Sequence, residues 1–528
     1  MSRYSGPAAT LADGWSLDRV TQPSRLFGAN GIAAGPDGRL YVAQVPGSQV
    51  SAIDIDTGII ETVSAMGGDI VAPDDLVFDE AANIYLTEIT ENRVCRRRPN
   101  GRVDVIRGDI PVANPITWHG GRLFAGECRI GARIMELPLD GSEPRVIASD
   151  VPMANAMQVG PDGKLYFPVM GTNQIWRVAL DGGAPEVVAG DLGVPDSVKF
   201  DSKGRIITTQ VASGQVLRID PATGTREVLA QLAPGLDNCA FVGERLFVSS
   251  IPGEIVEIVA PGQARPIVSR GLQWPLGLAA SDDGALFVAD GAFSYRLAEA
   301  GALETLCMLF TPGGPGYVRG VCSGGAPGQW IVTTGLGGVA RWSAGVEAEW
   351  LAQGLDRAMG VARTSRGMII VAEYGAGRLL SVDASGVAEL ASGLDMPMGV
   401  AVDSDDGIYV AEAGAGRVVK VRGSNSETVA DGLGRPEGLA WRDGELFALD
   451  TASKSVIRID PLRGHQIAVA SNLPVGAPVG VEPKPLGPIG DMAGPMINFA
   501  GVAAGADGSL YVSGDAEGSV LRLRSNLD

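Results

Sequence analysis

The sequence contains little histidine, few cysteines and no long apolar run. Its two histidines, His119 and His465, are too few for a zinc site built from several imidazoles. The five cysteines are odd in number and show no CxxC spacing, which favours a reduced compartment over a disulfide framework. No apolar run approaches the roughly 18 residues of a membrane span, and MSRYSGPAATLADGW lacks the features of a signal peptide. We therefore expect a cytoplasmic protein without a membrane partner.

Positive charge is also in short supply. Lysine and arginine total 42 against 61 aspartates and glutamates, giving a formal net charge of −19 at pH 7. Nucleic-acid binding requires a basic surface that can neutralise phosphates, so a nucleic-acid partner is not expected. The simplest consequence of the negative charge is that it keeps the protein dispersed in solution.

Glycine, in contrast, is abundant. Its 74 residues are about twice the usual frequency, whereas aromatic residues make up only 5% of the chain. Tight turns between strands need residues that tolerate positive φ, which glycine adopts without steric cost. The composition therefore favours many short strands joined by tight turns.

A repeat runs through the whole chain. NGIAAGPDGRLYVAQVPGSQVSAIDIDTG (30–58) aligns with NAMQVGPDGKLYFPVMGTNQIWRVALDGG (155–183), and MGVAVDSDDGIYVAEAGAGRVVKV (398–421) follows the same pattern. Each unit reads as a strand, an Asp-Gly type turn, a second strand, a glycine-containing loop and two further strands. A repeat of about 40 residues is typical of a four-stranded propeller blade.

The repeat predicts an all-β protein of two tandem six-bladed β-propellers, with twelve four-stranded blades. The first strands of the units begin at Asn30, Asp74, Asn114, Asn155, Asp196, Asp237, Leu276, Arg319, Met359, Met398, Glu437 and Ala500. One ring of twelve would be too wide, because propellers have about 4–8 blades. We place the break near 270–274, giving domains 1–271 and 272–528. A division into seven and five blades is the less supported alternative.

The residues at these twelve starts differ between the halves. The first six are all Asn or Asp, whereas the last six are Leu, Arg, Met, Met, Glu and Ala. The first strand of each blade lines the central channel, so the six polar side chains should converge at one end of it, here called the mouth. Carboxylates gathered there would repel one another, and a hard cation with oxygen ligands would relieve the repulsion. The alternative for each single position is a turn cap.

Three motifs support a family resemblance. ANAMQVGPDGKLYF, VPDSVKFDSKGRI and LDNCAFVGERLFVSS resemble the senescence marker protein/gluconolactonase/luciferin-regenerating enzyme family, which is also similar to diisopropylfluorophosphatase. The resemblance implies a six-bladed propeller that holds a divalent cation, with Asn114, Asn155 and Asp196 as ligands. It also implies that Asp196 is the general base or nucleophile. The second half shows only a looser, NHL-like repeat.

The resemblance is incomplete at the first blade. Asn30 stands where the family has a glutamate, so Asp74 or Asp237 would have to supply the second negative charge. The expected metal-binding set is therefore Asn30, Asp74, Asn114, Asn155, Asp196 and Asp237. Ca²⁺ is the first expectation for the cofactor, followed by Mg²⁺, Mn²⁺ or Zn²⁺.

A second set of residues, most of them polar, follows the second strand of each unit at the same end of the blades. In the first half these are Gln44, Glu88, Glu127, Val169, Gln210 and Ser250, and in the second Asp290, Thr334, Glu373, Glu412, Asp450 and Gly514. We interpret the second-half acids as acceptors of backbone N–H groups. Glu88 and Glu127 would surround the cation, which makes them candidates for acid–base catalysis or substrate contact beside Asp196.

The only long departure from the repeat is the insertion at 473–498 between the last two units. It is rich in proline, glycine and valine and should emerge at the mouth of the second propeller, as an irregular loop or as a lid. The apolar mouth of that propeller is compatible with a protein partner.

These observations predict a divalent-metal-dependent hydrolase of a lactone or related ester, acting on a small-molecule substrate at the mouth of the first propeller. Propeller enzymes that rely on histidine, such as the streptogramin lyase type, are disfavoured. A metal-dependent lyase or isomerase at the same site and a non-catalytic double-propeller scaffold remain alternatives.

Overall fold

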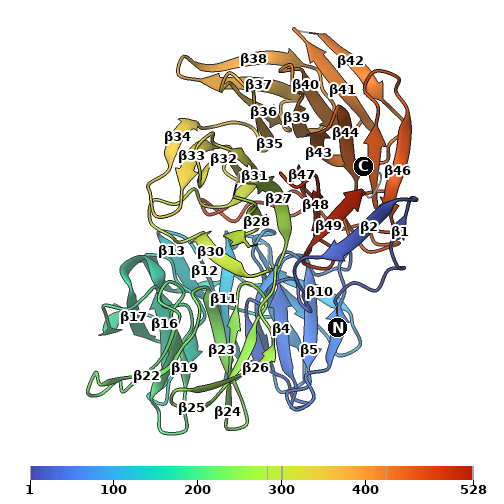
Figure 1. The fold of residues 1–528 in the computed structure, drawn as a ribbon. Coiled ribbons are helices and arrows are strands. Elements are labelled where there is room, and N and C mark those ends of the chain that lie inside the picture. Colours follow the sequence, from blue (N-terminus) through green and yellow to red (C-terminus); the bar gives the residue numbers. More distant parts are fainter. Residues whose placement is uncertain (1, 282, 299–300, 424, 526–528) are drawn as a thin grey trace. The chain divides into compact units, whose positions relative to one another are not determined.

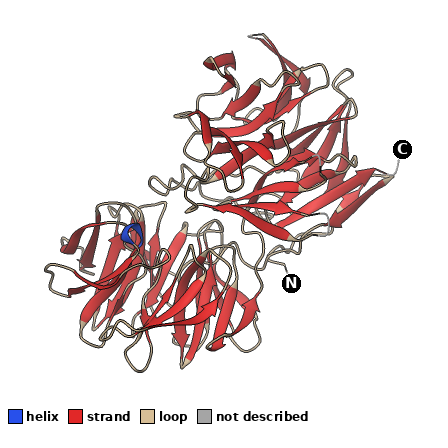
Figure 2. Ribbon diagram, turned by 60° about the vertical axis from the view of Figure 1, so that its left-hand side comes forward, coloured by secondary structure: helices blue, strands red, loops and turns tan. Residues whose placement is uncertain are grey.

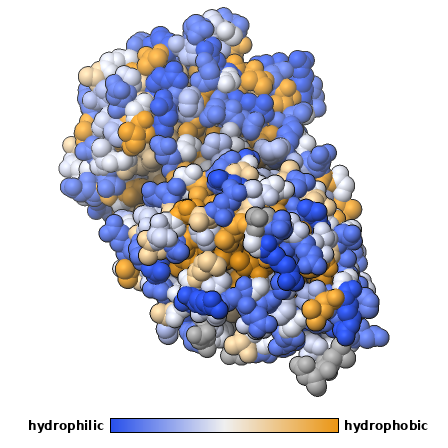
Figure 3. All heavy atoms as spheres, turned by 90° about the horizontal axis from the view of Figure 1, so that it is seen from above, coloured by the Kyte–Doolittle hydropathy of each residue, from blue (hydrophilic) through white to orange (hydrophobic). Residues whose placement is uncertain are grey.

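A computed structural model describes residues 2–281, 283–298, 301–423 and 425–525. Strands dominate the fold, and the only helix among these residues is the short 3₁₀ turn η1 (Met170–Thr172) (Figure 2). No helix in the described residues is long and apolar enough to span a bilayer. In the view of Figure 3 most surface side chains are hydrophilic, and apolar ones occur in separate groups between them.

The strands form twelve antiparallel sheets, in which the chain runs from the innermost to the outermost strand (Figure 1). Blades one to three are β3 (Ile32–Ala34), β4 (Leu40–Gln44), β5 (Gln49–Ile53), β6 (Ile60–Ser64); β7 (Pro73–Phe78), β8 (Ile84–Glu88), β9 (Arg93–Arg97), β10 (Val103–Arg107); and β11 (Ala113–His119), β12 (Arg122–Glu127), β13 (Ala132–Leu137), β14 (Arg145–Val151). Blades four to six are β15 (Gln158–Val159), β16 (Lys164–Val169), β17 (Gln174–Ala179), β18 (Glu186–Ala189); β19 (Lys199–Phe200), β20 (Ile206–Thr209), β21 (Gln215–Ile219), β22 (Arg226–Gln231); and β23 (Leu236–Val242), β24 (Arg245–Ser250), β25 (Ile255–Ala260), β26 (Gln263–Val268).

The second propeller repeats this order. Blades seven to nine are β27 (Pro275–Ala280), β28 (Leu286–Asp290), β29 (Phe293–Leu297), β30 (Leu303–Met308); β31 (Val318–Ser323), β32 (Gln329–Thr334), β33 (Val339–Ser343), β34 (Glu349–Ala352); and β35 (Ala358–Arg363), β36 (Ile369–Glu373), β37 (Arg378–Asp383), β38 (Gly386–Ser392). Blades ten to twelve are β39 (Pro397–Val402), β40 (Ile408–Glu412), β41 (Arg417–Arg422), β42 (Asn425–Ala430); β43 (Pro436–Arg442), β44 (Glu445–Asp450), β45 (Ser455–Ile459), β46 (Gln466–Ser471) with β1 (Thr10–Leu11); and β47 (Val502–Ala504), β48 (Leu510–Gly514), β49 (Ser519–Ser525) with β2 (Trp15–Arg19). The predicted fold class, two tandem six-bladed propellers, is confirmed, and the seven-plus-five alternative is wrong.

The N-terminus departs from the predicted domain boundary. Residues 2–25 belong to the compact unit of the second propeller, not to the first, whose blades occupy 26–270. The strand β2 is the outermost strand of the twelfth blade, with Trp15 opposite Ser525, and Figure 1 shows it beside β49. Pairing with β2 covers what would otherwise be an exposed strand edge. The sequence did not reveal this closure, because WSLDR carries no recognisable part of the repeat.

The insertion is the second departure. Residues 482–491, the middle of the predicted loop 473–498, belong to the compact unit of the first propeller. The residues on either side, up to 481 and from 492, belong to the second. The predicted location at the mouth of the second propeller is therefore wrong for this ten-residue segment.

Apolar side chains from adjacent blades form the cores. Between blades three and four, for example, one cluster contains the fully buried side chains of Phe124, Ile134, Met157 and Phe167. The residues between them on the same strand, such as Leu123 and Ala125, pack on the opposite face of the sheet against the second blade, as expected for sheets packed face to face. Truncating a buried phenylalanine at such a site costs about 3–5 kcal/mol.

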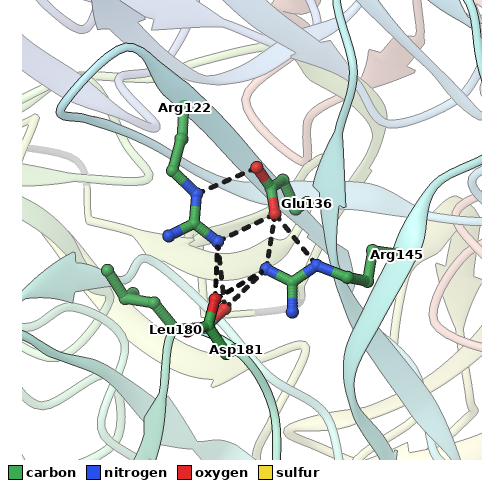
Figure 4. Close-up of polar contacts among 5 residues, drawn as sticks. All are labelled: Arg122, Glu136, Arg145, Leu180 and Asp181. Atoms are coloured by element: carbon green, nitrogen blue, oxygen red, sulfur yellow. Dashed lines mark hydrogen bonds and ion pairs between the residues drawn. The ribbon is translucent and has the colours of Figure 1, made fainter.

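Ion pairs link the blades near their outer edges. In blade three Arg122 and Arg145 both bind the Glu136 carboxylate, and both also donate to the Leu180 carbonyl in blade four (Figure 4). Hydrogen bonds from Arg122, followed by those from Arg145, lower the pKa of Glu136 to about 2. The cluster stabilises the contact between these two blades.

The channels of the two propellers differ at the residue that follows each of the twelve predicted first-strand starts. In the second propeller every such position is glycine: Gly277, Gly320, Gly360, Gly399, Gly438 and Gly501. A Cβ at Gly360 would lie 2.3 Å from the Met398 backbone oxygen of the next blade, and the other five face the same obstacle. In the first propeller the equivalent residues are Gly31, Asp75, Pro115, Ala156, Ser197 and Asn238. Side chains therefore fit in the first channel at a level where the second admits none.

Candidate functional site at the mouth of the first propeller

The six predicted Asn and Asp residues stand at or just before the innermost strands of blades one to six. Asp74, Asn114 and Asp237 lie within β7, β11 and β23, whereas the other three stand two or three residues before β3, β15 and β19. Asp74, Asn114, Asn155 and Asp196 are at most 8% exposed, and Asn30 and Asp237 are partly exposed. The apolar strand that follows each residue packs into the blade core and holds it at the start of the channel.

Two hydrogen bonds connect neighbouring members of this ring. Asn155 Nδ2 donates to Asp196 Oδ2 at 2.9 Å, and Asn30 Nδ2 donates to Asp237 Oδ2 at 3.3 Å. Asp196 Oδ1 is buried and has no hydrogen-bond partner among the described residues. A buried carboxylate oxygen without a partner is costly, so this atom is the clearest sign of a missing ligand.

The ring carboxylates share one electrostatic environment. Burial raises the pKa of Asp74 to about 8, with a smaller contribution from the neighbouring charge of Asp75. Burial, then the charges of Asp74 and Asp75, also raises the pKa of Asp196 well above its usual value. The pKa of Asp237 is raised by burial and then by Asp196 and Asp74. The three acids are therefore close enough that a proton or a cation is needed to balance their charge.

A second polar layer, below the ring, was missed by sequence reasoning. Asp75 Oδ1 accepts hydrogen bonds from the Leu76 N–H at 2.8 Å and from Asn238 Nδ2 at 3.3 Å. Burial raises the pKa of Asp75 to about 6, and the charge of Lys199 opposes this rise. The signal was present in the sequence: PDDLV and LDNCA each place a second polar residue where a core strand would be apolar.

The donor set determines which cation the ring fits. Among the residues that the structure describes, no three His, Cys, Asp or Glu side chains gather closely enough to hold a metal by themselves. Amide oxygens of asparagine must therefore contribute, which suits a hard cation such as Ca²⁺ or Mg²⁺. Asn155 Oδ1 already accepts a hydrogen bond from the Ala156 N–H at 2.8 Å, whereas Asn114 is bonded through its backbone carbonyl, which accepts from Thr87 Oγ1. With Asp196 Oδ1 unpartnered, the residues present fit such an ion.

Glu88 and Glu127, predicted to be catalytic, have structural partners instead. Glu88 accepts hydrogen bonds from the Val71 N–H and from Arg93, and Glu127 accepts them from Arg129 and Arg133. Both side chains are fully buried, with 0% exposure, and all four carboxylate oxygens are occupied. The geometry therefore does not support a catalytic role for either glutamate.

The same structural role recurs around both propellers. Gln44, Gln210, Glu373 and Glu412 each accept a hydrogen bond of 2.8–2.9 Å from a backbone N–H of the segment that leads into their blade. Asp450 does the same with two successive N–H groups. The repeated acid thus fixes the chain between blades, as predicted for the second half.

The mouth of the second propeller offers a different set of groups. Arg319 is fully buried, and its guanidinium donates to the Pro495 carbonyl. Glu437 accepts hydrogen bonds from the Ala500 N–H and from Arg435. Met359, Met398 and Phe499 pack together in one apolar cluster. The sequence predicted a more apolar mouth for the second propeller than for the first, and this packing reflects that difference.

The two histidines, His119 and His465, are exposed.

Comparison with known proteins agrees with these features. The family model described as SMP-30/Gluconolactonase/LRE-like region matches residues 118–252, which run from the third blade to the sixth and include Asn155, Asp196 and Asp237. No curated protein matches the chain.

Three solved structures are similar to part of this chain. Virginiamycin B lyase from Staphylococcus aureus is 16% identical, with a TM-score of 0.39 over 52% of this chain and 96% of its own. A gluconolactonase from Xanthomonas campestris is 17% identical, with a TM-score of 0.38 over 48% of this chain and 97% of its own. The nidogen/laminin complex is 20% identical, with a TM-score of 0.37 over 42% of this chain and 88% of the matched chain. The resemblance predicted from the motifs is confirmed, and over residues 118–252 the first propeller is similar to the SMP-30/gluconolactonase/LRE-like family.

Proposed function

We propose that the first propeller is a divalent-cation-dependent hydrolase of a lactone or related ester, with its active site at the mouth of the channel. The observation that carries this proposal is Asp196, a buried carboxylate with one oxygen unpartnered among the described residues. The charges of Asp74 and Asp75 act on Asp196. Asp196 also lies in the segment 118–252 that matches the SMP-30/Gluconolactonase/LRE-like family model. The scarcity of basic groups in this ring makes a cation the natural balance for its charge.

A divalent cation held by Asn114, Asn155 and Asp196, with Asp74 or Asp237 adding charge, would supply Lewis-acid polarisation of the ester carbonyl. The protein's own groups perform the remaining work. The Asn155 amide holds Asp196 Oδ2 and thereby leaves Oδ1 to accept a proton from water. The water oxygen bonds to the carbonyl carbon, the ester C–O bond breaks, and the proton passes to the departing alkoxide, which gives a hydroxy acid. Burial of Asp196 keeps bulk water from competing for its oxygens.

The proposal is tested with the purified full-length chain. Elemental analysis measures bound divalent cation, and a pH-stat measures acid release from a panel of five- and six-membered lactones and aryl esters. Replacing Asp196 with Asn should lower kcat by at least ~100-fold, since general-base catalysis contributes about 10²–10⁴. The exposed Asp191, in the segment between β18 and β19, gives the matched control, Asp191→Asn, which should leave kcat unchanged.

Product mass distinguishes hydrolysis from the alternative chemistry. Hydrolysis adds one water to the substrate, whereas a lyase or isomerase adds none. Absence of bound cation together with full activity in Asp196→Asn would overturn the proposed mechanism.

A further inference from the structure

The segment 482–491, here called the rim strap, packs against the first propeller although the chain on both sides of it belongs to the second. Lys484 Nζ lies 4.0 Å from Asp69 Oδ1. Gly487 lies against the Thr90 carbonyl, and Gly490 lies against Val112. The strap therefore contacts the first propeller at three separate points.

These contact points lie at the mouth end of blades two and three. Asp69 precedes β7, which carries Asp74; Thr90 follows β8 of the same blade; and Val112 precedes β11, which carries Asn114. The side chains of Thr90 and Val112 are only 4% exposed. The strap thus runs along the rim of the mouth beside blades two and three.

The composition of the strap suits a fixed wall. Prolines at 483, 485 and 488 restrict its backbone, which lowers the entropy cost of holding it in place. A Cβ at Gly487 would lie 2.6 Å from the Thr90 backbone oxygen, so only glycine permits this close approach. Leu486 and Ile489 are partly buried, which adds apolar contact.

One cysteine, Cys128, lies close to the strap and can serve as a chemical probe of access. The Cys128 N–H donates to the Val112 carbonyl, 2.9 Å away, so Cys128 adjoins the residue against which Gly490 rests. Burial, and then the charges of Asp74, Asp196 and Asp237, raise the pKa of the Cys128 thiol well above its usual value. Its side chain is 3% exposed. Access to Cys128 therefore measures access to the mouth from the side of the strap.

We propose that the rim strap forms one wall of the substrate mouth and limits the size of the molecule that reaches the ring. This inference rests on the proposed function for the identity of the substrate, an ester or lactone. The physical claim, that the strap restricts access by size, stands on the contacts of residues 482–491 alone. A compact lactone passes the wall, and a lactone or ester with a bulky substituent is excluded by it.

Thiol modification tests the physical claim without any substrate. In one variant, residues 482–491 are replaced by ten glycine and serine residues; in another, Gly487→Leu displaces the strap by a single side chain. Peptide mass spectrometry follows modification of Cys128 by iodoacetamide and by a bulky maleimide. We expect the maleimide rate at Cys128 to rise at least ~10-fold in both variants, and the iodoacetamide rate to rise less.

The controls address folding and general loosening. Gly108 is exposed, with no atom within 4 Å of a Cβ placed there, so Gly108→Leu is the matched glycine replacement on the same propeller. Cys239, buried in the apolar core between blades five and six beside Ser197, should keep its slow rate in every variant. If the Cys128 rates in Gly487→Leu equal those of the wild type and Gly108→Leu, the strap does not restrict access and the inference is wrong.

Kinetics test the substrate claim. For a bulky and a compact lactone, the ratio of kcat/KM values should shift at least ~10-fold toward the bulky substrate when the strap is replaced, with kcat for the compact one unchanged. An unchanged ratio despite faster Cys128 modification would overturn the size-selection role. If the wild type hydrolyses no lactone or ester while Cys128 still gains access, the proposed function fails and the strap remains a barrier to the mouth.

Discussion

Asn155 Nδ2 donates a 2.9 Å hydrogen bond to Asp196 Oδ2, while Asp196 Oδ1 has no partner in the described part of the chain. The two residues come from adjacent blades, 41 positions apart in the sequence. The bond fixes the carboxylate and leaves one of its oxygens for a ligand or a proton. This asymmetry distinguishes Asp196 from Glu88 and Glu127, whose oxygens are all engaged by the protein.

The bond makes Asn155 a positioning residue. Asn155→Leu keeps the approximate volume but removes the donor, so Asp196 loses its fixed orientation. We expect kcat for the best lactone to fall about 10–100-fold, within the range of a misplaced general base. Bound divalent cation, measured by elemental analysis, should fall as well, because the Asn155 amide is also a proposed ligand. A lower melting temperature without either change would assign Asn155 a purely structural role.

Glu127 should behave in the opposite way. It is fully buried and paired with Arg129 and Arg133, whose side chains are 42% and 38% exposed. Glu127→Gln removes the charge and weakens both pairs, which should lower the free energy of unfolding by ~2 kcal/mol. Turnover per folded molecule should stay within about twofold of the wild type. Chemical denaturation measures the free energy of unfolding, and kcat per folded molecule measures turnover. A large fall in kcat with unchanged stability would instead support a catalytic role for Glu127.

The glycine positions of the second propeller should be intolerant of any side chain. Gly360→Ala places a Cβ 2.3 Å from the Met398 backbone oxygen, so two innermost strands must separate. We expect a loss of about 1–3 kcal/mol in the free energy of unfolding. The exposed Gly108 provides the comparison, because Gly108→Ala meets no atom within 4 Å. Similar denaturation midpoints for the two variants would contradict the close approach of the strands.

A pH dependence is expected from Asp515 in the second propeller. Burial, and then the charge of Glu437, raises the pKa of Asp515 from 3.8 to about 7. The folded protein therefore binds a proton that the unfolded chain has released, and stability from this group is complete below about pH 4. It is lost as the pH rises toward 7 and is constant above that.

Asp515→Asn should remove this dependence, since the amide oxygen can still accept the 2.8 Å hydrogen bond from the Gly476 N–H. Compared with the wild type, the variant should gain up to a few kcal/mol of stability at pH 8 and little at pH 4. Denaturant unfolding at the two pH values measures the difference. An equal gain at both pH values would exclude titration of Asp515 as its cause.

The N-terminal segment should be necessary for the second propeller. Removing residues 2–25 exposes the edge of β49 and removes Trp15, which is 9% exposed and packs in the core with Phe447. Hydrogen exchange in β49 (Ser519–Ser525) should accelerate strongly, whereas exchange in β16 (Lys164–Val169) should not change. Trp15→Ala gives the milder version, with an expected loss of about 3–5 kcal/mol. Unchanged protection of β49 in the truncated chain would show that β2 is dispensable.

Much of the architecture followed from local sequence pattern. Asp-Gly turns such as Pro36–Asp37–Gly38, where Gly38 has a φ of 78°, and alternating strands such as LYVAQ recur at a fixed spacing. Because each blade contacts mainly its neighbours, this spacing was sufficient to count blades and to align their first residues. The six Asn and Asp positions of the candidate site came from that alignment.

The repeat in the sequence specifies the strands, the turns, the twelve blades and the register that gathers Asn155 and Asp196 at one end of a channel. The three-dimensional fold determines where the non-repeating segments go and which acids keep an unpartnered oxygen. WSLDR closes the last blade and residues 482–491 reach the first propeller, because these pairings join residues hundreds of positions apart and leave no periodic signal. It also engaged Glu88 and Glu127 with arginines and left Asp196 Oδ1 without a partner, since hydrogen-bond partners depend on three-dimensional proximity that spacing along the chain does not encode.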